Sequence, residues 1–188
     1  MAIFHYQILR SSSNNNRGLV HEIQAGDHYQ GTLWGAFTGL FGPASNELLV
    51  ISALADDAQP VASAAAVAHE SWQPTARPLG TQPCSEPGLY VFRRFNVREQ
   101  HVEEVVALSR QAWETFETSA DYAAQPQGLF RPAADADGSV RLMLVTWYDG
   151  FDSWEISRQP SPEAQENFQR RHALTLSTYA VATSLVHS

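Results

Sequence analysis

One pattern occurs twice in the 188-residue chain, and this repetition constrains the fold more than any other feature. In each half, a glycine-aromatic segment is followed by a turn and then by a run of apolar residues. Gly35 lies 13 residues before Leu48 in the first half, and Gly128 lies 14 residues before Leu142 in the second. Similar segments in the same order and at the same spacing indicate an internal duplication.

Hydrophobic periodicity predicts the order strand, helix, strand, strand, helix, strand in both halves. In the first half we expect strands at 3–9, 32–41, 47–54 and 72–79, the last an edge-like strand because it contains prolines. Its helices are expected at 18–25 and from Asp56 through Ala66, extending to His69. In the second half we expect strands at 89–96, 128–132, 140–148 and 175–186, helices at 99–119, 151–157 and 162–174, and a hairpin turn at 133–138.

The fold class predicted from this order is α+β, with two tandem ferredoxin-like βαββαβ units. The expected boundaries are 1–80 for the first unit, 81–88 for a linker and 89–188 for the second unit, because Pro83, Pro87 and small polar residues interrupt the pattern. Each antiparallel sheet would carry helices on one face. Its other face is also apolar and needs a cover, which the second sheet can supply by closing a pseudo-dimeric α+β barrel within one chain.

The composition excludes several kinds of chemistry. All 12 basic residues are arginine, so neither a Schiff-base lysine nor the lysine of a Walker A loop is present. A formal net charge of −8 argues against a nucleic-acid partner, because phosphate binding needs a clustered basic face. The single cysteine, Cys84, cannot form an internal disulfide, and we interpret it as an incidental exposed residue of the linker.

We also expect no metal, nucleotide or other cofactor. The seven histidines show no His-x-x-x-His spacing of the kind that zinc sites use. No apolar run approaches the ~18 residues of a membrane span. Residues 1–10 alternate apolar and polar side chains, unlike a signal peptide, so we expect a cytoplasmic protein without a membrane partner.

Three segments give the chain a family resemblance. They are Gly-Leu-Tyr-Val-Phe-Arg-Arg-Phe at 88–95, the glycine-aromatic strand, turn and apolar strand at 35–52, and the apolar strand at 141–154 with Trp147 and Tyr148 before a helix. In this order they resemble the dimeric α+β barrel superfamily and, within it, the tandem-repeat NIPSNAP-like proteins. The first half departs from the pattern, because Ala53 and Leu54 replace the aromatic pair.

The resemblance implies a fold and little chemistry, since NIPSNAP-like proteins mostly lack a defined activity. The wider superfamily includes cofactor-independent monooxygenases, haem-binding proteins, cyclases and isomerases that act on aromatic or apolar compounds. Two hypotheses follow. The chain binds or transforms a small apolar or aromatic molecule in a cleft between sheets, or it is a non-enzymatic interaction or scaffold protein with a filled barrel. It can be a monomer, because the halves cover each other, or a homodimer.

A candidate ligand site can be placed in the second half, although the residues identify no reaction. Tyr90 and Arg94 are four residues apart on one strand and therefore share a face, on which the rings would bind an apolar ligand and Arg94 an anionic or carbonyl group. Trp147 and His172 complete the predicted site. In the alternative facing, Val91, Arg93 and Phe95 line the barrel, and Arg93 takes the role of Arg94.

Overall fold

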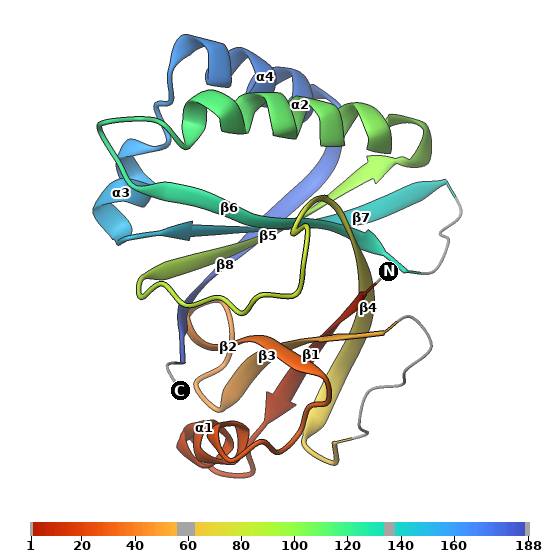
Figure 1. Ribbon diagram of the computed structural model, residues 1–188, viewed down its shortest axis with the longest axis vertical. Coiled ribbons are helices and arrows are strands. Elements are labelled where there is room, and N and C mark those ends of the chain that lie inside the picture. The colour runs from red at the N-terminus through yellow and green to blue at the C-terminus, as the bar shows by residue number, and fades with distance from the viewer. Residues whose placement is uncertain (1, 56–62, 134–137, 187–188) are drawn as a thin grey trace.

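In the part of the chain that the structure describes, eight antiparallel strands close into a barrel that three longer helices cover on the outside (Figure 1). The computed structural model describes residues 2–55, 63–133 and 138–186. The strands are β1 (Ile3–Arg10), β2 (Thr32–Phe41), β3 (Glu47–Leu54), β4 (Ala66–Arg77), β5 (Leu89–Arg98), β6 (Ala124–Pro132), β7 (Ser139–Tyr148) and β8 (Thr175–Leu185). The helices are α1 (Arg17–Gln24), α2 (Val102–Phe116), the short α3 (Phe151–Ile156) and α4 (Pro162–Ala173).

The strand order around the barrel is β1-β3-β2-β8-β5-β7-β6-β4, and β4 pairs with β1 to close it. Four consecutive strands therefore come from each half of the chain, in the order β4-β1-β3-β2 for the first half and β8-β5-β7-β6 for the second. The two groups join where β2 pairs with β8 and where β4 pairs with β6. The predicted α+β class and the antiparallel sheets are confirmed.

The barrel interior is packed with apolar side chains from all eight strands. Strands alternate the side chains of successive residues between the two faces, so each strand sends every second residue inward. The inward residues include a set of large rings in mutual contact, such as Phe37 against Tyr90 and Phe92, with centroids 5.1 and 5.0 Å apart. The buried interior cluster consists of Phe4, Tyr6, Trp34, Phe37, Leu49, Ile51, Ala53, Trp72, Tyr90, Phe92, Phe130, Met143, Val145 and Leu185.

The helices bury apolar stripes against the outer face of the barrel. In α2, Val102, Val105 and Trp113 recur at helical spacing and pack on Leu142 and Leu144 of β7. Helix α4 runs beside α2 over the strands of the second half, whereas α1 lies at the opposite end of the molecule (Figure 1). This arrangement places two helices side by side above the outward residues of β5 and β7.

The expected second helix of the first half is partly wrong. Residues 66–69 belong to β4, whose partners in β1 run from Phe4 to Leu9. Residues 56–62 of that prediction, and residues 134–137 of the expected hairpin turn, lie outside the described residues. Local propensity favoured a helix in this alanine-rich segment, but strand pairing with β1 satisfies its backbone in the fold.

Strand β4 also differs from the edge-like strand expected at 72–79, because it pairs with β1 on one side and with β6 on the other. Pro74 is accommodated where the register with β6 shifts between Pro74 and Arg77. Strand β6 begins at Ala124, four residues before its expected start. Both strands are longer than local patterns suggest because each acquires ladder partners from the other half of the chain.

The two glycine-aromatic segments have the same local geometry. Gly35 follows a register shift in β2, and Gly128 follows one in β6. At each glycine the ring of the residue two positions later, Phe37 or Phe130, occupies the space that a Cβ would need. These glycines therefore allow an inward aromatic ring to lie directly against the backbone.

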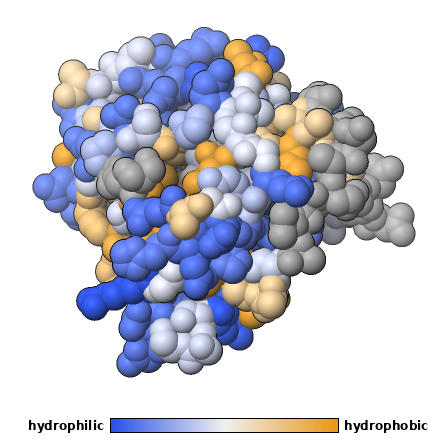
Figure 2. Space-filling model, turned by 60° about the horizontal axis from the view of Figure 1, so that its bottom comes forward, coloured by the Kyte–Doolittle hydropathy of each residue, from blue (hydrophilic) through white to orange (hydrophobic). Residues whose placement is uncertain are grey.

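Most of the face around α1 is hydrophilic, and its hydrophobic residues form small separate patches (Figure 2). Among the described residues, no helix has both the length and the apolar character needed to cross a membrane.

Candidate functional site

The two faces of strand β5 lie in different environments. Tyr90 and Phe92 are buried in the barrel interior, and Arg94 lies on the same face. Val91, Arg93 and Phe95 point to the outer side, toward α2 and α4. The predicted sharing of one face by Tyr90 and Arg94 is thus observed, and it is the barrel face.

Tyr90 is a fully buried core residue. Its hydroxyl donates a hydrogen bond of 2.9 Å to the Glu86 carbonyl, and burial raises the pKa of the phenol above its usual range. Cys84 packs against the same cluster instead of being exposed, because its backbone N–H donates to the Trp34 carbonyl at 2.7 Å and holds the linker against the barrel. Burial raises the pKa of the Cys84 thiol to about 12, so at neutral pH it is an unreactive thiol.

Arg94 has a carboxylate partner in the protein itself. Its Nη2 lies 2.7 Å from Oε2 of Glu70 in β4, and its guanidinium lies 4.6 Å from the centre of the Tyr6 ring. Glu70 also faces Arg141 at 3.4 Å. Arg94 therefore links β5 to β4 across the barrel, which is a structural role.

The structure does not bring the four predicted site residues together. Trp147 is half-buried against the interior cluster, and its indole N–H donates to the Pro87 carbonyl at 3.0 Å. His172 lies on α4, outside the barrel and on the opposite side of the sheet from Tyr90 and Arg94. A residue of α4 can meet only the outward residues of β5, so His172 is close to Arg93 and Phe95 instead.

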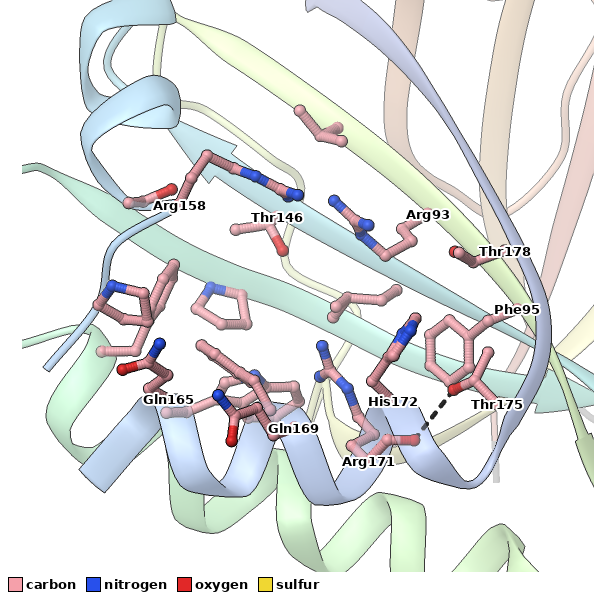
Figure 3. Close-up of a pocket in the computed structure, with 18 of the residues that line it drawn as sticks. Arg93, Phe95, Thr146, Arg158, Gln165, Gln169, Arg171, His172, Thr175 and Thr178 are labelled. Atoms are coloured by element: carbon pink, nitrogen blue, oxygen red, sulfur yellow. Dashed lines mark hydrogen bonds between the residues drawn. The ribbon is translucent and has the colours of Figure 1, made fainter. Parts of the chain in front are cut away.

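A pocket of about 410 Å³ lies between the outer face of the sheet and helix α4 (Figure 3). Its floor comes from β5 and β7, and its walls and rim come from α2, α4 and the segment before α4. Nine of the 19 lining residues are apolar or aromatic: Val91, Phe95, Trp113, Phe116, Pro126, Leu144, Tyr148, Pro160 and Phe168. Its polar lining residues are Arg93, Thr146, Ser157, Arg158, Gln165, Gln169, Arg171, His172, Thr175 and Thr178.

Three arginines from separate elements converge on this pocket. Arg93 comes from β5, Arg158 from the segment between α3 and α4, and Arg171 from α4, and their guanidinium groups point into the same space (Figure 3). Arg171 donates one hydrogen bond, to Oγ of Ser109 at 3.2 Å. None of the three has an ion-pair partner among the described residues, and the pocket lining includes no Asp or Glu.

Burial and mutual repulsion both act on these arginines. Burial, and then the positive charge of Arg93, lower the pKa of Arg171 to about 10. Burial, and then the charge of Arg158, lower the pKa of Arg93. Both groups remain charged at neutral pH, so each positive charge stays in the pocket without a protein carboxylate to balance it.

A second hollow lies at one end of the barrel, lined by Glu70, Ser71, Trp72, Asn96, Pro132, Ala133, Ser139 and Arg141. Its charged side chains are paired, since Glu70 binds both Arg94 and Arg141. The pocket under α4 differs because its cations are unpaired. Unpaired buried charge beside an apolar wall is characteristic of a ligand site, so we take the pocket under α4 as the candidate site.

Arg158 and Arg171 were not anticipated from the sequence. A signal was present for one of them, because Ala164, Phe168 and Arg171 recur at helical spacing and place an arginine on the apolar stripe of α4. No comparable signal marks Arg158, which reaches the pocket only because of how the segment after α3 folds back. The described residues contain no cluster of three or more metal-ligating side chains.

Comparison with known proteins identifies the fold. No family model matches the chain, and no curated protein matches it. Among solved structures, the chain is similar to an anthrone oxidase-like protein, with a TM-score of 0.65, 11% identity, and coverage of 99% of this chain and 92% of that one. It is also similar to a ferredoxin-fold protein from Listeria monocytogenes related to antibiotic biosynthesis monooxygenases, with a TM-score of 0.54, 9% identity, and coverage of 98% and 95%.

A third similar structure is a major regulator of staphylococcal pathogenesis, with a TM-score of 0.57, 13% identity, and coverage of 96% of this chain and 97% of that one. The Listeria protein is described as having a ferredoxin fold, which agrees with the α+β architecture of this chain. At such low identity the likeness concerns the fold alone. The fold hosts different functions, so function has to be argued from the site.

Proposed function

We propose that this protein binds, and by extension transforms, a small aromatic or apolar molecule in the pocket between the barrel and helix α4, without a cofactor. The observation that carries the proposal is the pocket itself, about 410 Å³ in volume and lined by aromatic and aliphatic side chains together with polar ones. Ligand pockets in proteins have volumes of roughly 300–1,000 Å³ and combine apolar walls with a few polar groups. The proposed site lies outside the barrel. It includes Arg93 and His172, and it does not include Tyr90 or Arg94.

The packing of the pocket favours a flat ring as the ligand. Phe95 on the floor and Phe168 on α4 both line the pocket, and Phe168 packs edge to face against Phe116, another lining residue, at a centroid distance of 5.6 Å. Aromatic pairs add about 0.5–1.5 kcal/mol beyond the burial of apolar area. A planar aromatic molecule in contact with a lining ring would gain this energy, which an aliphatic chain would not.

We further propose that the chain is a tandem-repeat, NIPSNAP-like protein, with units at 1–80 and 89–188 joined by residues 81–88. Two observations support this. The strand orders β4-β1-β3-β2 and β8-β5-β7-β6 correspond position by position. Gly35 with Phe37, and Gly128 with Phe130, repeat one local packing arrangement. The candidate pocket belongs to the second unit alone, in keeping with the sequence departure of the first unit at Ala53 and Leu54.

The second hypothesis, an interaction or scaffold protein, has one observation in its favour, because side chains fill the barrel interior. That packing argues against a ligand between the sheets, where the sequence had placed it. It does not affect the pocket on the outer face. The two hypotheses therefore differ in whether the pocket under α4 binds small molecules.

The test is binding of N-phenyl-1-naphthylamine, a neutral aromatic probe whose fluorescence rises in apolar surroundings. We expect saturable binding by the native chain and at least tenfold weaker binding by Gln169→Trp, because the indole fills the pocket from its α4 rim. Gln169 is solvent-exposed, so the substitution should leave the melting temperature unchanged.

The matched control is Gln111→Trp, the same change on an exposed position of α2 that does not line the pocket. It should bind the probe like the native chain. If the native chain does not bind the probe, or if the two tryptophan variants bind it equally well, the pocket is not a binding site and the interaction hypothesis takes its place.

A further inference from the structure

We propose that the ligand of this pocket is an aromatic anion, a ring system that bears a carboxylate, and that Arg93 and Arg171 bind the carboxylate while Arg158 closes over it from the rim. This inference rests on the proposed function and specifies its substrate class. It is derived from the charges in the pocket, which the apolar walls alone do not require.

The first argument is that the positive charge is unbalanced. Acidic residues outnumber basic ones 20 to 12 in this chain, yet none of the Asp and Glu residues that the structure describes lines the pocket. Elsewhere in the described residues, Arg10, Arg77, Arg94, Arg131 and Arg141 each have a glutamate partner. The other arginines without an ion pair there are exposed to solvent: Arg17, Arg98, Arg110 and Arg170. Because no carboxylate of the protein pairs with the pocket arginines, an anionic ligand can supply the missing negative charge.

The second argument concerns how Arg171 is held. Its guanidinium lies 4.9 Å from the centre of the Phe168 ring and 5.7 Å from that of Phe95. It also belongs to the last turn of α4, where the helix dipole favours a cation. Ring faces and the helix end stabilise the charge, but they use none of the N–H groups.

Hydrogen-bond donors therefore remain free for a ligand. The Ser109 hydroxyl accepts a single bond from Nη1 of Arg171, whereas a guanidinium has five N–H donors. For Arg93, no hydrogen-bond acceptor is found within the described parts of the chain. A carboxylate accepts paired N–H bonds from a guanidinium in a planar fork, which fits the chemistry of both groups.

The third argument is that the pocket combines charged and aromatic surface. Arg93, Arg158 and Thr146 gather on one side in Figure 3, and Arg171 and His172 point toward the same space from α4. The aromatic residues Trp113, Phe116 and Phe168 come from the helix side. A molecule with an anionic end and an aromatic body matches both parts, whereas an inorganic anion would leave the apolar walls uncovered.

The experiment compares 2-naphthoate with 2-naphthamide, which has the same ring system and nearly the same shape but no charge. Binding is measured by calorimetry at low salt with the native chain. We expect 2-naphthoate to bind at least tenfold more tightly, because only the carboxylate adds attraction between opposite charges and accepts paired hydrogen bonds from a guanidinium. Raising the salt concentration to about 0.5 M should reduce the difference in affinity between the two compounds, because salt screens the attraction between charges.

Arginine variants identify the groups responsible. Arg93→Met and Arg171→Met should each weaken 2-naphthoate binding about tenfold and leave 2-naphthamide binding within about twofold. Arg158→Met removes a more exposed cation, so a loss of about threefold is expected. The matched control is Arg170→Met, the adjacent exposed arginine of α4, which does not line the pocket and should retain the native preference.

Each outcome decides between the proposals. If both naphthalene compounds bind equally and both are excluded by Gln169→Trp, the anionic ligand class is wrong and the proposed pocket function stands. If neither compound binds and N-phenyl-1-naphthylamine also fails to bind, both proposals are wrong. If inorganic phosphate displaces 2-naphthoate at equal concentration, the pocket binds anions irrespective of the ring, and the aromatic part of the inference is overturned.

Discussion

Replacing Arg94 by methionine should destabilise the protein. The methionine keeps most of the apolar contact but removes the ion pair with Glu70, in which Nη2 and Oε2 are 2.7 Å apart. Two unit charges about 4 Å apart attract by about 4 kcal/mol at an effective dielectric constant of 20. The cation also lies 4.6 Å from the Tyr6 ring and 5.7 Å from the Trp72 ring, contacts worth about 0.5–1 kcal/mol each.

Several effects reduce this sum. The Glu70 side chain is 32% exposed, and Arg141 stays near it at 3.4 Å, so its charge remains partly compensated in the variant. The desolvation cost of burying Arg94 is also removed. We therefore expect a net loss of about 2 kcal/mol in the free energy of unfolding. For a chain of this length, that corresponds to a fall of roughly 4–8 °C in melting temperature.

The assay is thermal and urea unfolding of Arg94→Met, Glu70→Gln and the double variant. A double-mutant cycle should give a coupling energy of about 1–2 kcal/mol between the two side chains. Arg98→Met, on an exposed position of the same strand, is the matched control and should change stability by less than about 0.5 kcal/mol. An unchanged or higher melting temperature for Arg94→Met would refute the structural role of this arginine.

Three further outcomes are expected. Arg171→Met should raise the free energy of unfolding by about 1–2 kcal/mol, because it removes an unpaired buried charge. Scanning calorimetry of the native and variant chains measures the change, and a variant less stable than the native chain would contradict the prediction. Its stabilising effect should shrink as the pH rises above about 10, since the folded pKa of Arg171 is below that of the unfolded chain and native stability rises with pH from there. Gly128→Ala should lower the free energy of unfolding by about 1–3 kcal/mol, because its Cβ would overlap the ring of Phe130. The control Gly18→Ala in α1 has free space and should stabilise the protein slightly. Equal effects of the two substitutions on the urea midpoint would show that the ring does not require the glycine. Cys84 should react with a disulfide reagent at pH 8.5 no faster than local unfolding exposes it, because burial raises the pKa of its thiol. Reaction at the rate of an exposed cysteine would show that the thiol is not buried.

The arrangement of the candidate site shows where sequence reasoning reached its limit. Period-two alternation correctly put Tyr90 and Arg94 on one face of a strand and Arg93 on the other. It could not say which face meets the other sheet and which meets the helices, because both faces of β5 are rich in apolar residues. Placing His172 beside Tyr90 was therefore wrong in space, although His172 does lie next to Arg93 and Phe95.

Local patterns in the sequence determined the elements that depend on neighbouring residues: the α+β class, the strands of the second half, the α2 stripe and the glycines under Phe37 and Phe130. The tertiary structure alone decided what depends on residues distant in sequence. Residues 66–69 form a strand because β1 offers them a ladder, and Arg94 is neutralised because Glu70 lies across the barrel. The pocket contains three arginines, Arg93, Arg158 and Arg171, which come together only because α4 packs over β5. Nothing in the sequence around each arginine indicates that the other two lie nearby, because their charges interact only after packing brings them into one low-dielectric pocket.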